Sequence, residues 1–333
     1  MSKGILERLA EGPVLGDGGY LLELEKRGYV QAGPFTPEVV IEHPDALAQL
    51  HREFLRAGAE VLQTMTFYAS DDKLATVGLA GKVDEINRDA VGIARKVAAE
   101  GDALVAGNLS LTWAYDPADP KSADHVRALF DRQLQDQLDA GPPDFWIGET
   151  FSYLGEAILF VERAKRTGLP VMVTMCFEQV EPRSYEGDTP GEAAKQLADA
   201  GADVVGVNCL NGPKWQLPIA VEMRGSVDAY VATQPVAYRT DGERPDFTST
   251  GAFPYDLDPL QLSRHDLAEF AQQANDAGIQ YIGSCCGSVA AHVRAMAKVL
   301  GKLPEEEREW KSRGEKAMSA YEYYEHTETE VPK

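Results

Sequence analysis

Eight short apolar runs, each ending in small or polar residues, constrain the fold of this 333-residue chain more than any other feature. They lie at residues 14–17, 60–64, 103–107, 145–149, 171–176, 204–209, 230–234 and 281–285. The stretches between them carry apolar residues at helical spacing, for example Leu47, Leu50, Phe54 and Leu55. Near-continuous apolar strands that alternate with amphipathic helices are typical of a parallel sheet covered on both faces.

Glycines punctuate this pattern, because a helix that ends in a left-handed cap favours a residue without a Cβ. The seven that precede a predicted strand are Gly58, Gly101, Gly141, Gly168, Gly201, Gly225 and Gly278. A βα unit repeated eight times predicts an α/β fold of the (β/α)8 TIM-barrel type. An open doubly wound sheet is the competing architecture, but no strand runs into G-x-G-x-x-G or G-x-x-x-x-G-K-S/T.

The predicted barrel occupies residues 1–303 as one domain. Residues 304–333 are expected to form a short acidic, helical extension and not a separate domain. This extension carries Tyr321, Tyr323 and Tyr324, which suit a helix lying on the barrel or an oligomer contact.

Charge excludes several functions. The chain has 53 acidic and 32 basic side chains, for a net charge of -21, and no Lys/Arg cluster offsets it. Nucleic acid and anionic membrane surfaces are therefore not expected as partners. No window approaches the roughly 20 apolar residues of a spanning helix, and residues 1–13 have no export signal. A cytoplasmic location is expected.

Three cysteines follow predicted strands: Cys209 after the sixth, and Cys285 and Cys286 after the eighth. The carboxyl ends of barrel strands share one face, so these thiols can converge on one soft cation, with zinc the natural choice. Three ligands leave a fourth position open. The alternative is that Cys209 and Cys285 are buried apolar residues, and Cys176 is interpreted as a packing residue of this kind.

The open position suggests a substrate thiol, because zinc holds a sulfur ligand as a nucleophilic thiolate at neutral pH. Sulfur alkylation is then the natural reaction. If the thiol belongs to an amino acid, Asp17 and Glu149 can bind its ammonium group, and backbone N–H groups of Gly18 and Gly19 its carboxylate. Asp-Gly-Gly is also an ordinary turn sequence.

Aromatic residues in the segments after the first four strands can hold a methylated cation against their ring faces. They are Phe35, Phe67, Tyr68, Trp113, Tyr115 and Phe151. Packing within loops is the alternative for about half of them. Thr64, Thr150 and Asn208 lie at the same strand ends and complete the predicted substrate-binding set.

Four motifs resemble the homocysteine S-methyltransferase family, and most closely its betaine-using branch. They are Asp17-Gly18-Gly19 and residues 63–70, 206–209 and 283–287. The resemblance implies a zinc-dependent (β/α)8 barrel with one zinc per chain on Cys209, Cys285 and Cys286. It implies homocysteine and a small onium methyl donor as substrates, with methionine as product. Asp17 and Glu149 then correspond to the family's acidic pair, and Tyr68 and Phe67 orient the onium group.

The chain departs from the betaine-using members at two cage positions, with Phe35 in place of a Trp and Thr150 in place of a Tyr. Glycine betaine is the first choice of donor. Dimethylsulfoniopropionate, another betaine, S-methylmethionine and S-adenosylmethionine are the alternatives. A non-catalytic barrel that binds osmolytes and carries structural zinc is the alternative of another class. The sequence ends 47 residues after Cys286, so a homo-oligomer is left open but the tetramer of the animal enzymes is not assumed.

Overall fold

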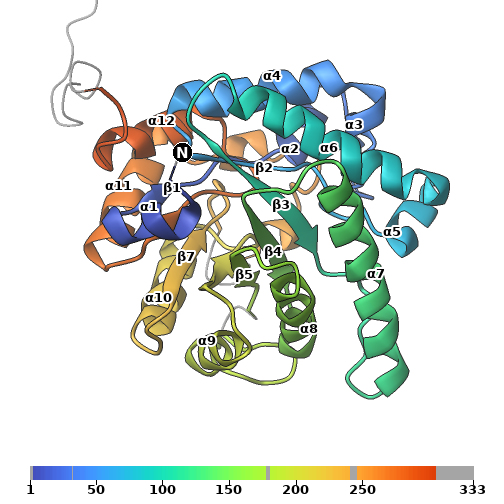
Figure 1. The fold of residues 1–333 in the computed structure, drawn as a ribbon. Helices are drawn as coiled ribbons and strands as arrows, with labels where there is room; N and C mark the ends of the chain where they lie inside the picture. Colours follow the sequence, from blue (N-terminus) through green and yellow to red (C-terminus); the bar gives the residue numbers. More distant parts are fainter. Residues whose placement is uncertain (1–2, 32, 178–180, 241–245, 305–333) are drawn as a thin grey trace, which may run out of the picture.

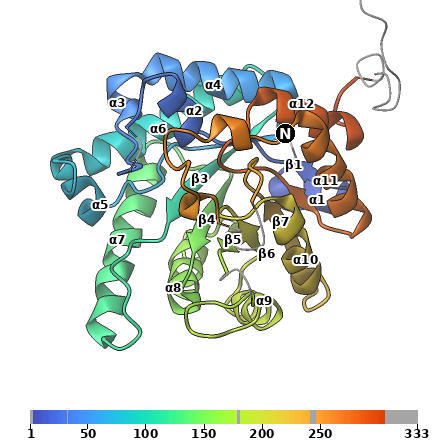
Figure 2. The same ribbon diagram turned by 180° about the vertical axis from the view of Figure 1, so that it is seen from behind.

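A computed structural model describes residues 3–31, 33–177, 181–240 and 246–304, and confirms the predicted (β/α)8 barrel (Figures 1 and 2). All eight strands are parallel and pair in the order β1-β8-β7-β6-β5-β4-β3-β2. The strands are β1 (Val14–Leu15), β2 (Val61–Gln63), β3 (Leu104–Ser110), β4 (Phe145–Phe151), β5 (Val171–Met175), β6 (Val204–Asn208), β7 (Tyr230–Gln234) and β8 (Tyr281–Ile282).

Strands β1 and β2, the two ends of the strand order, are joined by individual hydrogen bonds and not by a regular ladder. We call this junction the β1–β2 seam. Glu60 N donates to Leu15 O at 2.9 Å, and Leu15 N donates to the Glu60 side chain at 2.9 Å. At the carboxyl end of the seam, Gln63 N donates to Asp17 Oδ2 at 2.8 Å. Two carboxylates thus supply acceptors where a regular ladder between β1 and β2 is missing.

Helices surround the strands, and the figures show them arranged around the barrel (Figures 1 and 2). The α-helices are α1 (Ile5–Glu11), α2 (Leu21–Lys26), α3 (Val39–Glu42), α4 (Pro44–Ala57), α5 (Asp71–Ala75), α6 (Val83–Ala98), α7 (Pro120–Asp139), α8 (Leu154–Lys165), α9 (Pro190–Asp199), α10 (Pro213–Arg224), α11 (Arg264–Asp276) and α12 (Ala290–Val299). Three 3-10 helices are η1 (Ala80–Lys82), η2 (Phe247–Ser249) and η3 (Asp258–Leu260).

Sequence explains where several helices begin and which face they bury. In α4, Leu47, Leu50 and Phe54 are fully buried, as their spacing predicts. Helix α9 begins with a capping box, in which Thr189 accepts from Glu192 N and Glu192 accepts from Thr189 N.

The left-handed glycine caps are confirmed at five of the seven predicted positions and are wrong at two. Gly58, Gly141, Gly168, Gly201 and Gly278 have positive φ. Gly225 instead ends α10 in a right-handed conformation, with φ of -71°. Gly101, which is not among the positive-φ glycines, serves close packing, because a Cβ there would lie 3.0 Å from Leu55 Cδ1.

The barrel interior is filled at its amino-terminal end by inward-facing strand residues, with Ile5 and Leu9 of α1 packed against them. At the opposite end, where the strands finish, polar side chains such as Gln63 and Asn108 lie beside apolar ones such as Met65. Among the described helices, none is both long enough and apolar enough to cross a membrane. The extension predicted for residues 304–333 lies, apart from Pro304, outside the described residues.

Candidate active site

Three thiols meet at the carboxyl ends of β6 and β8. The Sγ atom of Cys286 lies 3.9 Å from that of Cys209 and 4.0 Å from that of Cys285, and all three sulfurs lie within 4.8 Å of one another. All three are free cysteines. Sulfurs bound tetrahedrally to zinc at about 2.3 Å stand about 3.8 Å apart, so this donor set fits that ion. The convergence predicted from sequence is therefore present.

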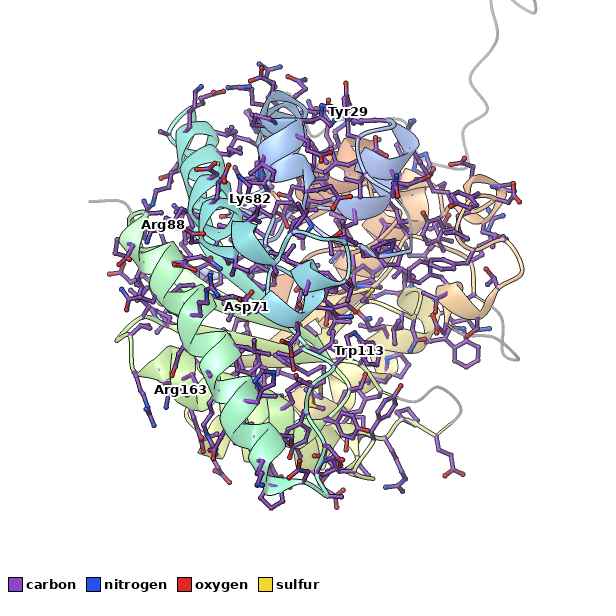
Figure 3. All side chains as sticks on the ribbon, turned by 90° about the vertical axis from the view of Figure 1, so that its right-hand side faces the viewer. Tyr29, Asp71, Lys82, Arg88, Trp113 and Arg163 are labelled. Carbon is purple, nitrogen blue, oxygen red and sulfur yellow. The ribbon has the colours of Figure 1, made fainter. Side chains whose placement is uncertain are left out.

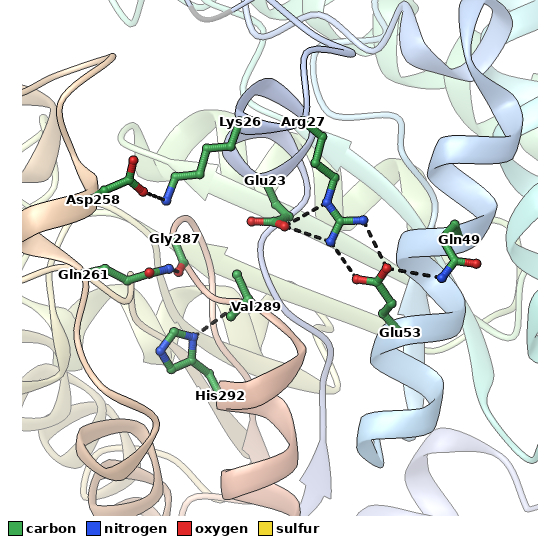
Figure 4. A network of polar contacts seen from close by, with 10 residues as sticks. All are labelled: Glu23, Lys26, Arg27, Gln49, Glu53, Asp258, Gln261, Gly287, Val289 and His292. Atoms are coloured by element: carbon green, nitrogen blue, oxygen red, sulfur yellow. Dashed lines mark hydrogen bonds and ion pairs between the residues drawn. The ribbon is translucent and has the colours of Figure 1, made fainter.

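Main-chain bonds hold the loops that carry these thiols. Cys285 N donates to Pro235 O at 2.8 Å, and Ala237 N donates to Cys286 O at 2.8 Å. The next residue is also fastened, because Gln261 Nε2 donates to Gly287 O at 2.6 Å (Figure 4). The segment after β8 is thus bonded to the segment after β7, which fixes the positions of two of the three sulfurs.

Electrostatics favour a cation among the thiols. The hydrogen bond with Cys209, together with burial, raises the pKa of the Cys285 thiol well above its ordinary value. Thiolates at this place therefore need a compensating positive charge, which a divalent metal ion supplies. Cys176 lies outside the cluster and donates to Asn208 O at 3.0 Å, in agreement with its interpretation as a packing residue.

Glu149, on β4, faces the same cavity as the thiols. Its Oε1 accepts from Asn108 Nδ2 at 2.6 Å and its Oε2 from Asn208 Nδ2 at 3.0 Å. Burial raises the pKa of Glu149 to about 7, against the opposing effect of the Asn108 bond, and the negative charge of Asp17 adds to the rise. This carboxyl therefore changes its charge near neutral pH.

Asp17 lies behind the cavity wall and is fully buried. Its Oδ2 accepts from Gln63 N at 2.8 Å and from the Tyr20 hydroxyl at 2.5 Å. Its Oδ1 has no hydrogen-bond partner in the described part of the chain. Burial raises the pKa of Asp17 to about 6.

The cavity itself has a volume of about 160 Å³. Its described lining residues are Gly18, Gly19, Tyr20, Leu21, Phe35, Gln63, Thr64, Met65, Phe67, Tyr68, Asn108, Glu149, Thr150, Cys209, Leu210, Gln234, Phe247, Thr248, Ser284, Cys285 and Cys286. Most of the predicted site residues are therefore brought together here. Asn208 stands directly behind this wall, bonded to Glu149 and to Thr150.

Gly19 lines the cavity but is not available for one predicted role. Its N–H donates to Ser288 O at 3.2 Å, so it does not bind a substrate carboxylate. Its close approach to the thiol loop is the structural reason for a glycine, because a Cβ on Gly19 would lie 2.7 Å from Cys285 O.

Phe67 and Tyr68 form the aromatic part of the wall, with ring centroids 4.2 Å apart. The Tyr68 hydroxyl accepts from Trp113 Nε1 at 2.7 Å, and the Lys73 ammonium lies 4.2 Å from the Tyr68 ring centroid. Trp113 is 59% exposed (Figure 3) and supports Tyr68 from outside the cavity. Burial raises the pKa of Tyr68 to about 12, so its hydroxyl stays protonated.

Besides Trp113, two of the predicted aromatic residues do not reach the cavity lining. Tyr115 packs against Tyr153, with centroids 5.6 Å apart. Phe151 is fully buried in the core against Phe130 and Phe160. A bulge in β4 explains the second case, because the positive φ of Thr150 reverses the alternation of side chains after Glu149.

Backbone strain is concentrated around this cavity. The described non-glycine residues with positive φ are Phe35, Tyr68, Trp113, Thr150, Cys209 and Leu210. All of them line the cavity or, in the case of Trp113, bond to a residue that does. Such conformations are unfavourable, above all for a β-branched residue such as Thr150, and they are typical of functional sites.

Sequence reasoning missed several residues of this region, among them Tyr20, His51 and Phe247. Tyr20 could have been found, because it directly follows Gly19. His51 forms a hydrogen bond with Tyr20, but the sequence shows it only as a polar residue on the buried face of α4. Phe247 comes from the segment between β7 and α11, where no periodic pattern marks it.

Comparison with known proteins confirms the resemblance seen in the motifs. The sequence model of the homocysteine S-methyltransferase family matches residues 14–300. Betaine–homocysteine S-methyltransferase 1 of Xenopus tropicalis is 47% identical over 310 residues, covering 90% of this chain and 75% of the relative. The S-methylmethionine–homocysteine S-methyltransferase of Pongo abelii is 43% identical over 309 residues, covering 90% of this chain and 81% of the relative.

Among solved structures, the metallated homocysteine methyltransferase MmuM of Escherichia coli superposes with a TM-score of 0.69. It is 23% identical and the match covers 87% of this chain and 98% of that one, which supports the fold. The barrel, the cavity and these matches define a methyltransferase. The chain belongs to the homocysteine S-methyltransferase family.

Proposed function

We propose that this chain transfers a methyl group from a small onium compound, with glycine betaine as first choice, to the sulfur of homocysteine, giving methionine. The observation that carries the proposal is one cavity with three thiols and Glu149 on its wall together with Phe67 and Tyr68. A sulfur nucleophile and a methylated cation can be held there within reach of each other.

We further propose that Cys209, Cys285 and Cys286 hold one zinc ion per chain. When bound, zinc lowers the pKa of a substrate thiol and so supplies homocysteine as a thiolate at neutral pH. The spacing of the three sulfurs and the need for a compensating positive charge support this assignment.

Glu149 and Asp17 are proposed to orient homocysteine through its ammonium group. Both carboxyls are buried, and the negative charge of Asp17 raises the pKa of Glu149. A bound ammonium would relieve this repulsion and favour the ionised form of both groups. Thr64 and the backbone at Gly18 lie on the same wall, where they can contact the rest of the amino acid.

Phe67 and Tyr68 are proposed to hold the onium group, with Phe35 on the same cavity wall. A ring face stabilises a methylated cation by about 0.5–2 kcal/mol. The homocysteine sulfur then forms a bond to the methyl carbon as the carbon–nitrogen bond of glycine betaine breaks. The electron pair of that bond stays on nitrogen and leaves dimethylglycine, with inversion at the methyl carbon.

Two relatives support different donors, because one is named for betaine and the other for S-methylmethionine. Glycine betaine stays our first choice, since the betaine-named relative is the more similar of these two.

The test is methionine formation by the zinc-loaded protein with homocysteine and each donor in turn: glycine betaine, dimethylsulfoniopropionate, S-methylmethionine and S-adenosylmethionine. We expect the highest kcat/KM with glycine betaine and one dimethylglycine per methionine. Phe67→Leu should raise the KM of the donor without changing that of homocysteine. The proposal would be refuted if protein shown to contain zinc formed no methionine with any of these donors.

A further inference from the structure

We propose that Tyr20 and His51 form a hydrogen-bond chain that positions Asp17 as an acceptor for the ammonium group of homocysteine. This inference rests on the proposed function and adds two positioning residues to it. Tyr20 lies between β1 and α2, whereas His51 lies in the middle of α4. The chain therefore links a helix of the outer ring to the cavity.

The contacts are short and partly buried. The Tyr20 hydroxyl lies 2.5 Å from Asp17 Oδ2 and 3.0 Å from His51 Nδ1. The rings of Tyr20 and His51 meet edge to face at 5.0 Å, and Phe54 packs on Tyr20 at 5.2 Å. Asp17 and His51 are both fully buried, so the two ends of the chain are shielded from water.

Only one arrangement of protons satisfies the chain when Asp17 is ionised. A hydroxyl has a single proton, and Tyr20 must donate it to the Asp17 carboxylate. The Tyr20 oxygen can then accept only from a protonated Nδ1 of His51. Burial lowers the pKa of His51 to about 3, so the ring is neutral and its proton is on Nδ1.

This arrangement leaves one oxygen of Asp17 available. The Tyr20 hydroxyl and Gln63 N both donate to Oδ2 and thereby fix the orientation of the carboxylate. Oδ1 is buried without a hydrogen-bond partner among the described residues. The next residue, Gly18, and the two donors to Oδ2, Tyr20 and Gln63, line the cavity. An ammonium group is a donor that would satisfy Oδ1 and balance its charge.

The experiment compares two thiols that differ only in the group at issue. Homocysteine and 4-mercaptobutyrate have the same carbon chain, carboxylate and thiol, but 4-mercaptobutyrate lacks the ammonium. We would measure the Kd of each for zinc-loaded wild type, Tyr20→Phe, His51→Leu and His51→Asn. Tyr281→Phe is the matched control, because it removes another buried tyrosine hydroxyl that has no hydrogen-bond partner among the described residues.

We expect Tyr20→Phe to weaken homocysteine binding about tenfold, the usual size for losing one bond to a charged group, and to leave 4-mercaptobutyrate binding unchanged. His51→Leu should weaken homocysteine binding in the same way. His51→Asn should retain most of the affinity, since its amide can donate from the position of Nδ1. Tyr281→Phe should not change the ratio of the two Kd values.

Two results would overturn the inference. One is an equal loss for both thiols in Tyr20→Phe, which would indicate a role in packing only. The other is no change in either Kd. Failure of the proposed function is recognised separately, because wild type would then bind neither thiol, or would bind both equally, before any substitution is made.

Discussion

The side-chain amide of Asn108 donates to Glu149 Oε1 at 2.6 Å and to Gln63 Oε1 at 3.1 Å. Asn108 directly follows the predicted third strand and lies inside β3, with Glu149 on the neighbouring strand β4. This bond favours the ionised form of Glu149 and opposes the effect of burial on its pKa. The charge of the proposed ammonium-binding carboxylate thus depends on a side chain that does not itself carry charge.

Asn108→Ala should therefore raise the pKa of Glu149 above about 7 and weaken homocysteine binding at neutral pH. Loss of a bond to a charged group predicts a KM for homocysteine about tenfold higher at pH 7. The difference should shrink at pH 9, where Glu149 ionises in both proteins, and the comparison of the two KM values checks this. Asn87→Ala is the control, because it removes a buried amide whose partners among the described residues are main-chain oxygens and Gln137. The prediction would be contradicted if the ratio of the KM values of Asn108→Ala and wild type were the same at pH 7 and pH 9.

The ligand-free protein should lose stability as the pH rises towards 8. The folded-state pKa values of Asp17 and Glu149, about 6 and about 7, are raised above the ordinary 3.8 and 4.5. The folded state therefore binds these protons more tightly than the unfolded state, and that advantage disappears as pH rises through the folded values. For one carboxyl, a pKa raised by about two corresponds to at most about 3 kcal/mol of unfolding free energy.

Chemical denaturation of wild type and Glu149→Gln between pH 5 and 8 measures this effect. The free energy of unfolding should fall less in the variant, because the glutamine side chain has no charge to form inside the protein. The glutamine of the variant also has one accepting oxygen in place of two, which lowers its stability at every pH. The effect of removing the titrating group should therefore appear in how the free energy of unfolding changes with pH, more than in its absolute value. Identical slopes would show that Glu149 does not titrate in this range.

Cys286→Ser should remove most of the bound zinc, since an alcohol replaces a thiolate ligand. We expect metal affinity to fall by at least about a hundredfold and methionine formation to fall with it. Cys176→Ser is the matched control, because Cys176 lies near the cluster and outside the set of three. Metal analysis of the dialysed proteins checks both. Zinc retained at one per chain in Cys286→Ser would contradict the assignment of this ligand.

Much of the site could be predicted because a barrel brings strand ends to one face. Cys209 and Cys285 are 76 positions apart in sequence, yet their sulfurs lie within 4.8 Å of each other. The strand pattern alone places them at the ends of β6 and β8. The same logic places Glu149 and Thr64 in the cavity wall, where the structure has them.

The failures have equally local causes. Phe151 is predicted near the cavity because it follows the fourth predicted strand, but the bulge at Thr150 turns its side chain into the core. His51 could not be recognised, because its partner Tyr20 is 31 positions away and no periodic rule connects the two. The β1–β2 seam likewise depends on side-chain acceptors, which strand patterns do not reveal.

Gly19→Ala should damage the metal centre through the backbone. A Cβ at this position would lie 2.7 Å from Cys285 O and 3.1 Å from Cys286 Cα, and neither is a flexible side-chain end. The thiol loop must move, so we expect zinc affinity to fall by about tenfold or more, a change that costs about 1.4 kcal/mol or more.

Gly92→Ala is the opposite case, because α6 has open space there and a helical alanine is favoured by about 0.5–1 kcal/mol. Gly92→Ala should thus raise the unfolding free energy and leave zinc binding alone. The zinc affinity of both variants is measured by competition with a metal chelator. Equal zinc affinities for Gly19→Ala and Gly92→Ala would mean that the thiol loop tolerates the added methyl group.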